Sequence, residues 1–246
     1  MRRGGGGAPA YSPSSDPLSL LWWDPRSVSP GAVASWVDRI AAVNASQGTG
    51  ANQPTASATA ISSAFPGVTS DGNDLLVAAG AGAILSGRTT LTVVAAMVDA
   101  TTGTQLAWEY TASATANAGG FYLSVNEAAG NLRALVRPNV GFTSRQQIET
   151  LAAVKVVSVA YDFAASGANN VPFIRVNGVP LAISTVSAAG TPGSAANASL
   201  HLFARSGVAV PWAGAFGDFV VRNSVSQDAA LDSLERYIGA RVGLTW

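Results

Sequence analysis

The sequence predicts an all-β protein, built as one antiparallel β-sandwich with a single α-helix near its C-terminal end. Three observations support this prediction. Short β-prone runs alternate with turn-forming clusters from residue 17 onward, at intervals typical of sandwich strands. The chain has 246 residues, a length that sandwiches often reach as a single domain. The only convincing amphipathic helical pattern lies close to the end of the sequence.

The N-terminal segment has a different composition from the remainder of the chain. It reads MRRGGGGAPAYSPSSDP, with glycines and prolines where a secretory signal needs an apolar stretch. A segment of this composition cannot fold alone. We therefore interpret residues 1–16 as a flexible arm that anchors the domain to a neighbouring protein, with Arg2, Arg3 and Tyr11 as anchoring side chains. Residues 17–246 form the predicted domain.

Ten runs are predicted as strands because they are rich in β-prone residues and lie between turn signals, and several of them alternate cleanly between two faces. In NLRALVRP, for example, Leu132, Ala134 and Val136 share one face. The ten runs are Leu18–Trp23, Asp74–Ala78, Thr89–Val98, Gln105–Thr111, Gly120–Asn126, Asn131–Arg137, Val154–Phe163, Pro172–Val176, Leu200–Ala204 and Ala215–Arg222.

The segment VPFIRVNGVPLAI predicts a β-hairpin, because Asn177 and Gly178 form the strongest short turn signal in the chain. Pro172 and Pro180 favour an edge or strand-end position for it, since proline cannot donate to a β-ladder. The stretches 44–60 and 184–199, rich in alanine, serine, glycine and threonine, are predicted as solvated loops.

The terminal helix is predicted from its caps and its apolar stripe. Ser224 or Ser226 can cap the helix, with Gln227 completing a capping box after Ser224, and Gly243 can end it in the left-handed conformation. The stripe consists of Leu231, Leu234, Ile238 and Val242. Asp232 and Arg236 are spaced as a favourable ion pair along the helix. We expect the helix to cover an edge or one end of a sheet.

Several segments together resemble a known family. The ending FGDFVVRNSVSQDAALDSLERYIGARVGL resembles the final segment of concanavalin A-like lectin/glucanase domains, of the laminin-G-like jelly-roll type found in tailed-phage and bacterial surface proteins, with Val242 in place of the usual tyrosine. The segments LWWDPRSV, FPGVTSDGNDLLVA, FIRVNGVPL and ANASLHLFAR are similar to earlier parts of the same domains, with Ser70 replacing a phenylalanine. The resemblance runs from Leu18 to Leu244 and implies a concanavalin A-like jelly roll of two facing sheets.

Composition excludes several classes of partner. Fourteen basic and fourteen acidic residues give a net charge of zero, so the chain shows no electrostatic preference for nucleic acid or anionic membranes. Its apolar runs have only strand length, which predicts no membrane insertion. The chain has no cysteine, so it forms no disulfide or thiolate metal site. We expect synthesis in a host cytoplasm.

The residues needed for catalysis by relatives of this fold are missing. Glucanases of the fold carry two glutamates and an aspartate as E-x-D-x-x-E, because a retaining mechanism needs paired carboxylates on one face. None of the four glutamates, Glu109, Glu127, Glu149 and Glu235, has an aspartate two residues later. The only histidine, His201, lies within an apolar strand and is interpreted as a strand residue rather than a ligand. We predict no enzymatic activity and no cofactor.

Two groups of residues remain as binding candidates. Aromatic rings that stack on sugar faces are typical of glycan sites, and Trp108, Tyr110 and Trp212 are the candidates for that role. A structural role for them stays open, and Trp22, Trp23 and Trp36 are assigned to the core. In DGND, Asp71, Asn73 and Asp74 are weak calcium candidates, because loop carbonyls would have to complete the oxygen shell. The alternative is an Asx turn before a strand, and it is favoured.

These observations predict a virion-surface protein of a tailed phage, either a fibre, a spike or a decoration protein. A lectin-like domain would bind host-surface glycans, and the arm would contact other virion proteins. The resemblance, the glycine-rich arm and a composition of thirteen arginines and one lysine favour this reading. A structural cement protein without sugar binding is the alternative, and a homo-oligomer stays open. A polysaccharide-degrading enzyme is a third hypothesis, with Asp99, Glu109 and Asp162 as its carboxylates.

Overall fold

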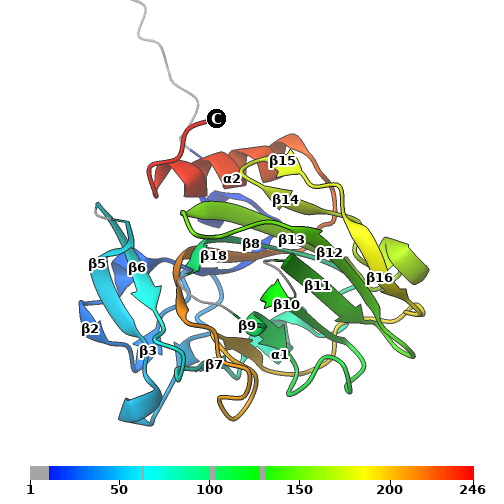
Figure 1. The fold of residues 1–246 in the computed structure, drawn as a ribbon, viewed down its shortest axis with the longest axis horizontal. Coiled ribbons are helices and arrows are strands. Elements are labelled where there is room, and N and C mark those ends of the chain that lie inside the picture. Colours follow the sequence, from blue (N-terminus) through cyan, green and yellow to red (C-terminus); the bar gives the residue numbers. More distant parts are fainter. Residues whose placement is uncertain (1–10, 63, 100–102, 128–130) are drawn as a thin grey trace, which may run out of the picture.

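A computed structural model describes residues 11–62, 64–99, 103–127 and 131–246 of the chain. Within these residues two nine-stranded antiparallel sheets pack face to face (Figure 1). Sheet A has the strand order β15-β14-β13-β8-β18-β6-β5-β2, with β1 paired to β18. Sheet B has the order β16-β12-β11-β10-β9-β17-β7-β4-β3. The predicted fold class, an antiparallel β-sandwich with one C-terminal helix, is confirmed.

The strands of sheet A are β1 (Ser19–Trp23), β2 (Gly31–Ala32), β5 (Thr55–Ser62), β6 (Phe65–Thr69), β8 (Thr90–Asp99), β13 (Lys155–Asp162), β14 (Ile174–Val176), β15 (Val179–Pro180) and β18 (Gly214–Arg222). The strands of sheet B are β3 (Ser35–Trp36), β4 (Ala45–Ser46), β7 (Leu76–Ala78), β9 (Gln105–Tyr110), β10 (Gly120–Glu127), β11 (Asn131–Arg137), β12 (Thr143–Ile148), β16 (Ser184–Ala188) and β17 (Leu200–Leu202). The helices are α1 (Ala81–Leu85) and α2 (Ala229–Ala240), with short 3-10 turns η1 (Pro13–Ser15), η2 (Pro25–Ser27), η3 (Gly50–Asn52) and η4 (Gly167–Asn170).

All ten predicted strands are present, and their ends differ from the predicted ends by no more than two residues. The prediction that 44–60 and 184–199 are loops is wrong, because β4, most of β5 and all of β16 lie in these stretches. Both β5 and β16 are rich in alanine and serine, which have little strand preference of their own. Pairing with β6 and β12 holds them in the sheets instead.

The main core lies between the sheets, and β8 is buried on both of its faces. Leu91 and Val93 point into the inter-sheet core. Val94 and Ala96 point to the opposite side of sheet A, into a second apolar cluster. This double burial explains why β8 reads as a nearly continuous apolar run instead of an alternating one.

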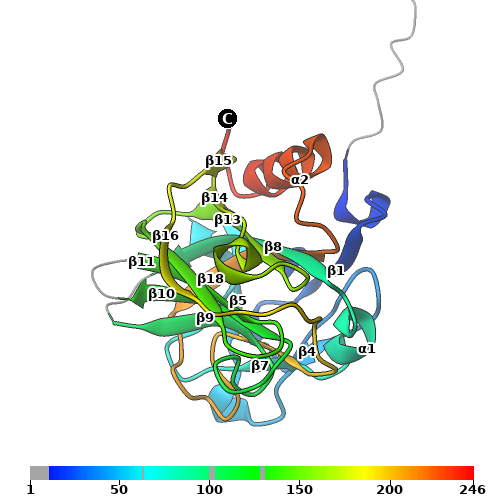
Figure 2. The ribbon, with the colours of Figure 1, turned by 90° about the vertical axis from the view of Figure 1, so that its right-hand side faces the viewer.

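Helix α2 covers the outer face of sheet A, on the side away from sheet B (Figures 1 and 2). Its predicted stripe is buried against Val94, Ala96 and Ala160 of β8 and β13. The expectation that the helix covers a sheet edge or end is therefore wrong. The outer residues of these central strands are apolar, and burying them removes more hydrocarbon from water than shielding an edge would.

The N-terminal cap of α2 differs from the prediction, whereas its C-terminal stop is the predicted one. Asp228 is the N-cap, and its Oδ1 accepts a hydrogen bond from the backbone N–H of Leu231 at 2.8 Å. The two serines predicted as caps, Ser224 and Ser226, lie in the connection between β18 and the helix. At the other end Gly243 has a φ of 82°, which confirms the predicted left-handed stop.

Residues 11–16, which the sequence assigns to the arm, pack against the domain. The Tyr11 ring meets Tyr237 of α2 edge-on, with ring centres 6.0 Å apart. Asp16 is buried and accepts a hydrogen bond from Arg222 Nε at 2.9 Å. The two anchoring arginines, Arg2 and Arg3, lie outside the described residues. A buried ion pair and a ring contact fix this segment, so the domain begins earlier than residue 17.

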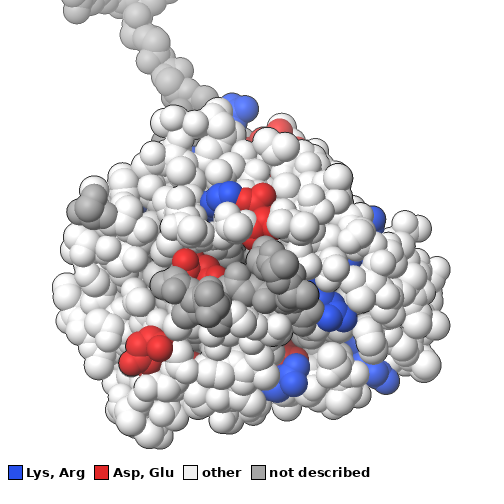
Figure 3. Space-filling view, in the orientation of Figure 1, with Lys and Arg blue, Asp and Glu red and all other residues white. Residues whose placement is uncertain are grey.

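Charged side chains are few and scattered on the face shown in Figure 3, where most of the visible surface is uncharged. This agrees with the 11% of charged residues in the whole sequence. Among the described residues, no helix is both long enough and apolar enough to cross a membrane.

Candidate functional site

The structure buries the three aromatic side chains predicted to stack on sugars. Trp108, Tyr110 and Trp212 are each 0% exposed and belong to the inter-sheet core. Their polar atoms are satisfied inside the protein, by hydrogen bonds from Trp108 Nε1 to Tyr161 Oη (3.1 Å), from Tyr110 Oη to Ala196 O (2.6 Å) and from Trp212 Nε1 to Asp99 Oδ1 (2.9 Å). Stacking needs an exposed ring face, so these residues do not form a sugar-binding surface in this structure.

The weak calcium candidates form the loop between β6 and β7. Asp74 Oδ2 accepts a hydrogen bond from Asp71 N at 3.1 Å, and Asp71 Oδ1 accepts one from Asn73 N at 3.3 Å. Burial raises the pKa of the Asp74 carboxyl. All three residues line a polar hollow of about 370 Å³ beside β2, β5 and β6. The described residues contain no cluster of three metal-binding side chains, and the loop geometry fits the Asx-turn alternative.

The three carboxylates of the enzyme hypothesis lie apart. Asp99 ends β8, whereas Asp162 pairs with Thr90 at the opposite end of that strand. Nine residues of extended strand separate these two positions, a distance of roughly 30 Å. Glu109 belongs to the other sheet, where it is fully buried and binds Arg205 Nε at 2.7 Å. The structure therefore does not assemble them into one catalytic group.

His201 lies beside this ion pair and is almost completely buried. Its Nδ1 is 3.3 Å from the backbone oxygen of Glu109, and burial lowers the pKa of the imidazole. Its place in β17 agrees with the interpretation as a strand residue.

An exposed aromatic ring occurs elsewhere, at Trp246. It is 42% exposed and is the only aromatic residue among the large exposed apolar side chains of the described chain. The ring lies between Gly239 of α2 and Gly178 of the β14–β15 turn. A Cβ atom at residue 178 would lie 2.7 Å from Trp246 Nε1, and one at residue 239 would overlap the six-membered ring. The two glycines therefore create the space that holds this indole.

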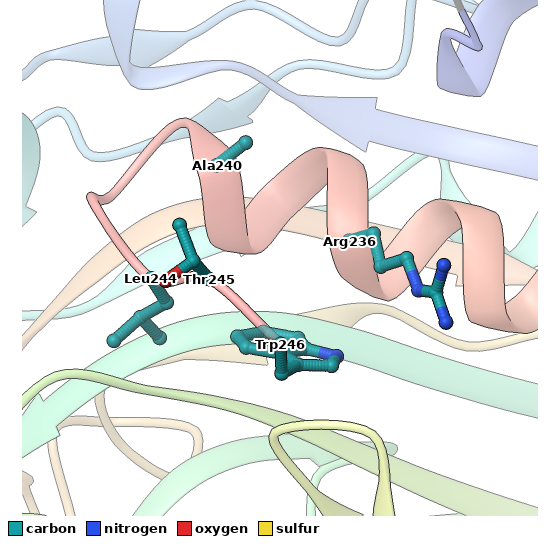
Figure 4. Close-up of a pocket in the computed structure, with 5 residues that line it drawn as sticks. All are labelled: Arg236, Ala240, Leu244, Thr245 and Trp246. Carbon is teal, nitrogen blue, oxygen red and sulfur yellow. The ribbon is translucent and has the colours of Figure 1, made fainter.

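One side of the indole faces a hollow of about 210 Å³, lined by Arg236, Ala240, Leu244, Thr245 and Trp246. Figure 4 shows the indole below α2, with its nitrogen at the end nearer to Arg236. Ala240 and Leu244 supply apolar carbon, and Thr245 supplies a hydroxyl. We call this hollow the indole pocket.

A second hollow, of about 150 Å³, shares Arg236 and Trp246 with the indole pocket, and its other lining residues are Arg175, Gly178, Asp232 and Glu235. Arg175 from β14 is within 2.7 Å of Asp232 and 3.0 Å of Glu235. Glu235 is buried and accepts a hydrogen bond from Ser158 Oγ at 2.6 Å, and burial raises the pKa of its carboxyl. We call this hollow the charged pocket.

Local structure brings these groups together. Residues 232, 235, 236, 239 and 240 recur at helical spacings of three and four, so they share one side of α2. The turn between β14 and β15 has φ values of 50° at Asn177 and 79° at Gly178, as the predicted hairpin requires. The left-handed Gly243 then turns the chain back along α2, where Leu244 N bonds to Gly239 O at 2.9 Å.

Sequence reasoning did not identify this site. It assigned Asp232 and Arg236 to an ion pair within the helix, whereas the structure pairs Asp232 with Arg175. A usable signal was present, because Trp246 follows the helix-ending Gly243 at a position that no helical or strand periodicity requires to be apolar. Glycines at both Gly178 and Gly239 could also have suggested a bulky neighbour.

Comparisons with known proteins concern the fold. No family model and no curated protein matches the chain. Trypanosoma rangeli sialidase in complex with 2,3-difluorosialic acid superposes with a TM-score of 0.60 at 16% identity, covering 100% of this chain and 36% of the sialidase chain. The ligand-binding domain of botulinum neurotoxin serotype D, in complex with N-acetylneuraminic acid, gives a TM-score of 0.55 at 11% identity and covers 91% and 51% of the two chains.

A third similar structure is domain 4 of AbnA, a GH43 extracellular arabinanase from Geobacillus stearothermophilus, in complex with arabinotriose. Its TM-score is 0.53 at 12% identity, and the match covers 87% of this chain and 97% of that domain. The chain spans little more than a third of the sialidase chain, so whole-enzyme properties do not transfer. At these identities the likeness shows the architecture alone, which is a two-sheet antiparallel β-sandwich.

Proposed function

We propose that the protein is a non-enzymatic carbohydrate-binding domain whose sugar site lies at Trp246. One observation carries the proposal: a half-exposed indole, seated between two glycines, joins an apolar pocket to a charged one. Sugars present an apolar ring face for stacking and hydroxyls for hydrogen bonds. The indole face, the Arg236 guanidinium and the half-exposed Asp232 carboxylate match these two requirements.

The polar hollow at Asp71 is larger, but no aromatic ring lines it. Amides, hydroxyls and carboxylates alone compete poorly with water for sugar hydroxyls, because each bond formed replaces one to solvent. The Trp246 site is therefore the better candidate. The solved complexes of the toxin domain with N-acetylneuraminic acid and of the arabinanase domain with arabinotriose support the proposal, since proteins of similar architecture bind sugars.

The proposed setting is the virion surface of a tailed phage, where the domain would bind host-surface glycans. The support is the resemblance from Leu18 to Leu244 and the arginine-rich, low-charge composition. Protein identification in purified particles, combined with localisation by antibody labelling, tests this setting. Absence of the protein from intact particles would contradict it.

A glycan array on the purified full chain tests sugar binding. We expect wild-type protein to bind a subset of glycans, and Trp246→Ala to weaken that binding by about tenfold or more through loss of stacking. Trp246→Phe should retain part of the affinity. Ile148→Ala is the matched control, because Ile148 is also an exposed apolar residue but lies on β12 of the other sheet.

The other outcomes separate the alternatives. Uniformly blank arrays would contradict sugar binding and favour a cement protein. Binding that survives Trp246→Ala but is lost on Asp71→Asn would move the site to the polar hollow. Release of reducing sugar from host polysaccharide would contradict the non-enzymatic proposal.

A further inference from the structure

Among the residues that the structure describes, Arg236 is the only cationic side chain that lines both pockets, and no ion pair holds it. It is exposed on α2 and lines the indole pocket and the charged pocket alike. The ion pairs of the described residues give it no carboxylate partner, although Asp232 lies one helical turn away. An exposed guanidinium without a partner is available to bind an anion from solution.

The two carboxylates of the charged pocket are both in direct contact with a different arginine, Arg175. Arg175 is 2.7 Å from Asp232 and 3.0 Å from Glu235, and its own side chain is 7% exposed. Glu235 is buried behind this contact, with a side chain that is 1% exposed. Of the two guanidinium groups, Arg236 is therefore the exposed one, and no ion pair of the described residues holds it.

The geometry suits a bidentate contact beside a stacked ring. In Figure 4 the nitrogen of the Trp246 indole is at the end of the ring nearer to Arg236, and this nitrogen also lies beside Gly178 of the charged pocket. Because Arg236 and Trp246 line both pockets, a sugar stacked on the indole would have one part of its ring edge near the guanidinium. A planar guanidinium binds a planar carboxylate through two parallel hydrogen bonds, a match that a hydroxymethyl group cannot provide.

We infer that the site selects sugars that carry a carboxylate, such as uronic or nonulosonic acids, over neutral sugars, with Arg236 as the residue that determines this specificity. The inference rests on the proposed function, because it requires a sugar on Trp246. Asp232, held by Arg175, would accept hydroxyl hydrogen bonds in the charged pocket, which Trp246 also lines.

The test compares two ligands that differ only at the carboxylate, methyl β-D-glucuronide and methyl β-D-glucoside, by ligand-detected NMR titration. We expect the wild-type protein to prefer the glucuronide by about fivefold at low salt, the range of a partly exposed charge pair. The preference should shrink at high ionic strength because salt screens exposed charges.

Three variants identify the cause. In Arg236→Ala and Arg236→Gln the affinities for the glucuronide and the glucoside should become about equal. Glucoside binding should remain, since neither substitution changes the indole. Trp246→Ala should weaken the binding of both ligands to a similar extent. Arg39→Ala is the matched control, because Arg39 is another exposed arginine, in the segment after β3, that lines neither pocket.

The results distinguish failure of the inference from failure of the function. Equal binding of both ligands by wild-type protein, or a preference that survives Arg236→Ala, overturns the acidic-sugar inference and leaves sugar binding intact. Absence of binding for both ligands, together with blank glycan arrays, overturns the proposed function itself.

Discussion

At the residue scale, alternation along a strand identifies which side chains share a face but not which face is buried. Trp108 and Tyr110 do lie on one side of β9, opposite Glu109. That side faces the second sheet, so both rings are in the core. Glu109, on the other side, is also buried because Arg205 and the backbone N–H of Ala114 bind it. The direction of a face depends on the position of the other sheet.

Gly239→Ala should displace the indole of Trp246. Alanine in a helix is ordinarily more stable than glycine by about 0.5–1 kcal/mol. Here the added Cβ would overlap the indole ring, so we expect weaker sugar binding and little or no gain in stability. The measurement is a double-mutant cycle with Trp246→Ala, using urea unfolding. In the Trp246→Ala background, Gly239→Ala should increase the free energy of unfolding. An equal increase in both backgrounds would contradict the position of the indole against Gly239.

At the element scale, α2 shows how a helix is defined locally but placed globally. Its apolar stripe and its left-handed stop at Gly243 follow from sequence spacing. Its position on the outer face of sheet A follows from Val94 and Ala96, whose side chains need cover on that face. Asp228 is the N-cap because its carboxylate also lies within 3.2 Å of Arg222 on β18, a contact that neither serine makes in this structure.

Asp228→Ala should destabilise the protein by about 1 kcal/mol at neutral pH, whereas Asp228→Asn, which retains a capping oxygen, should cost less. Burial opposes ionisation of Asp228, but hydrogen bonds from Leu231 N–H and the charge of Arg222 lower its pKa overall. A lowered carboxyl pKa gives stability above the unfolded-state pKa, which is lost as the pH falls through the folded-state value. Urea unfolding at decreasing pH should therefore show that the wild-type protein loses its greater stability relative to Asp228→Asn. A stability difference that stays constant with pH would contradict this prediction.

At the scale of the whole molecule, the two ends of the domain are joined through β18. Trp22 Nε1 of β1 donates to Asp218 Oδ1 at 2.8 Å, and Arg241 Nε, after α2, donates to Asp218 Oδ2 at 2.8 Å. Arg241 also pairs with Asp24 and lies over the Trp22 ring, 5.8 Å from its centre. Segments distant in the sequence thus share one buried charge network.

Arg241→Met should destabilise the protein by about 3–5 kcal/mol at neutral pH, because Asp218 would remain buried and charged without its cation. Burial already raises the pKa of Asp218 despite the opposing charge of Arg241. A raised carboxyl pKa contributes stability that is fully present below the unfolded-state pKa and is lost as the pH rises through the folded-state value. The loss of stability caused by Arg241→Met should therefore become smaller as the pH is lowered.

Asp218→Asn combined with Arg241→Met serves as the control, since the amide oxygen still accepts from Trp22 and only Asp24 is left without its cation. Denaturant unfolding followed by tryptophan fluorescence should show that the double variant regains much of the stability lost in Arg241→Met. A deficit in Arg241→Met that is independent of pH would indicate lost packing against Trp22 instead.

The sequence by itself determined the fold class, an antiparallel β-sandwich with one helix, and the strands that are rich in apolar and β-branched residues. Apolar alternation, the Asn177–Gly178 turn and the helix stripe depend on neighbours within a few residues, and such patterns are read directly from the chain. The same reasoning missed β5 and β16, because alanine and serine become strand residues there only through pairing with another strand.

Only the tertiary structure decided which aromatic rings meet solvent and which charges meet one another. Trp246 is exposed, and Arg175 reaches Asp232 across 57 positions in the sequence. Burial and ion pairing depend on which elements pack together, and that is set by the summed contacts of the whole chain. Local spacing therefore predicted the sandwich, whereas the candidate site became visible only when α2, the β14–β15 hairpin and the C-terminal residues were placed side by side.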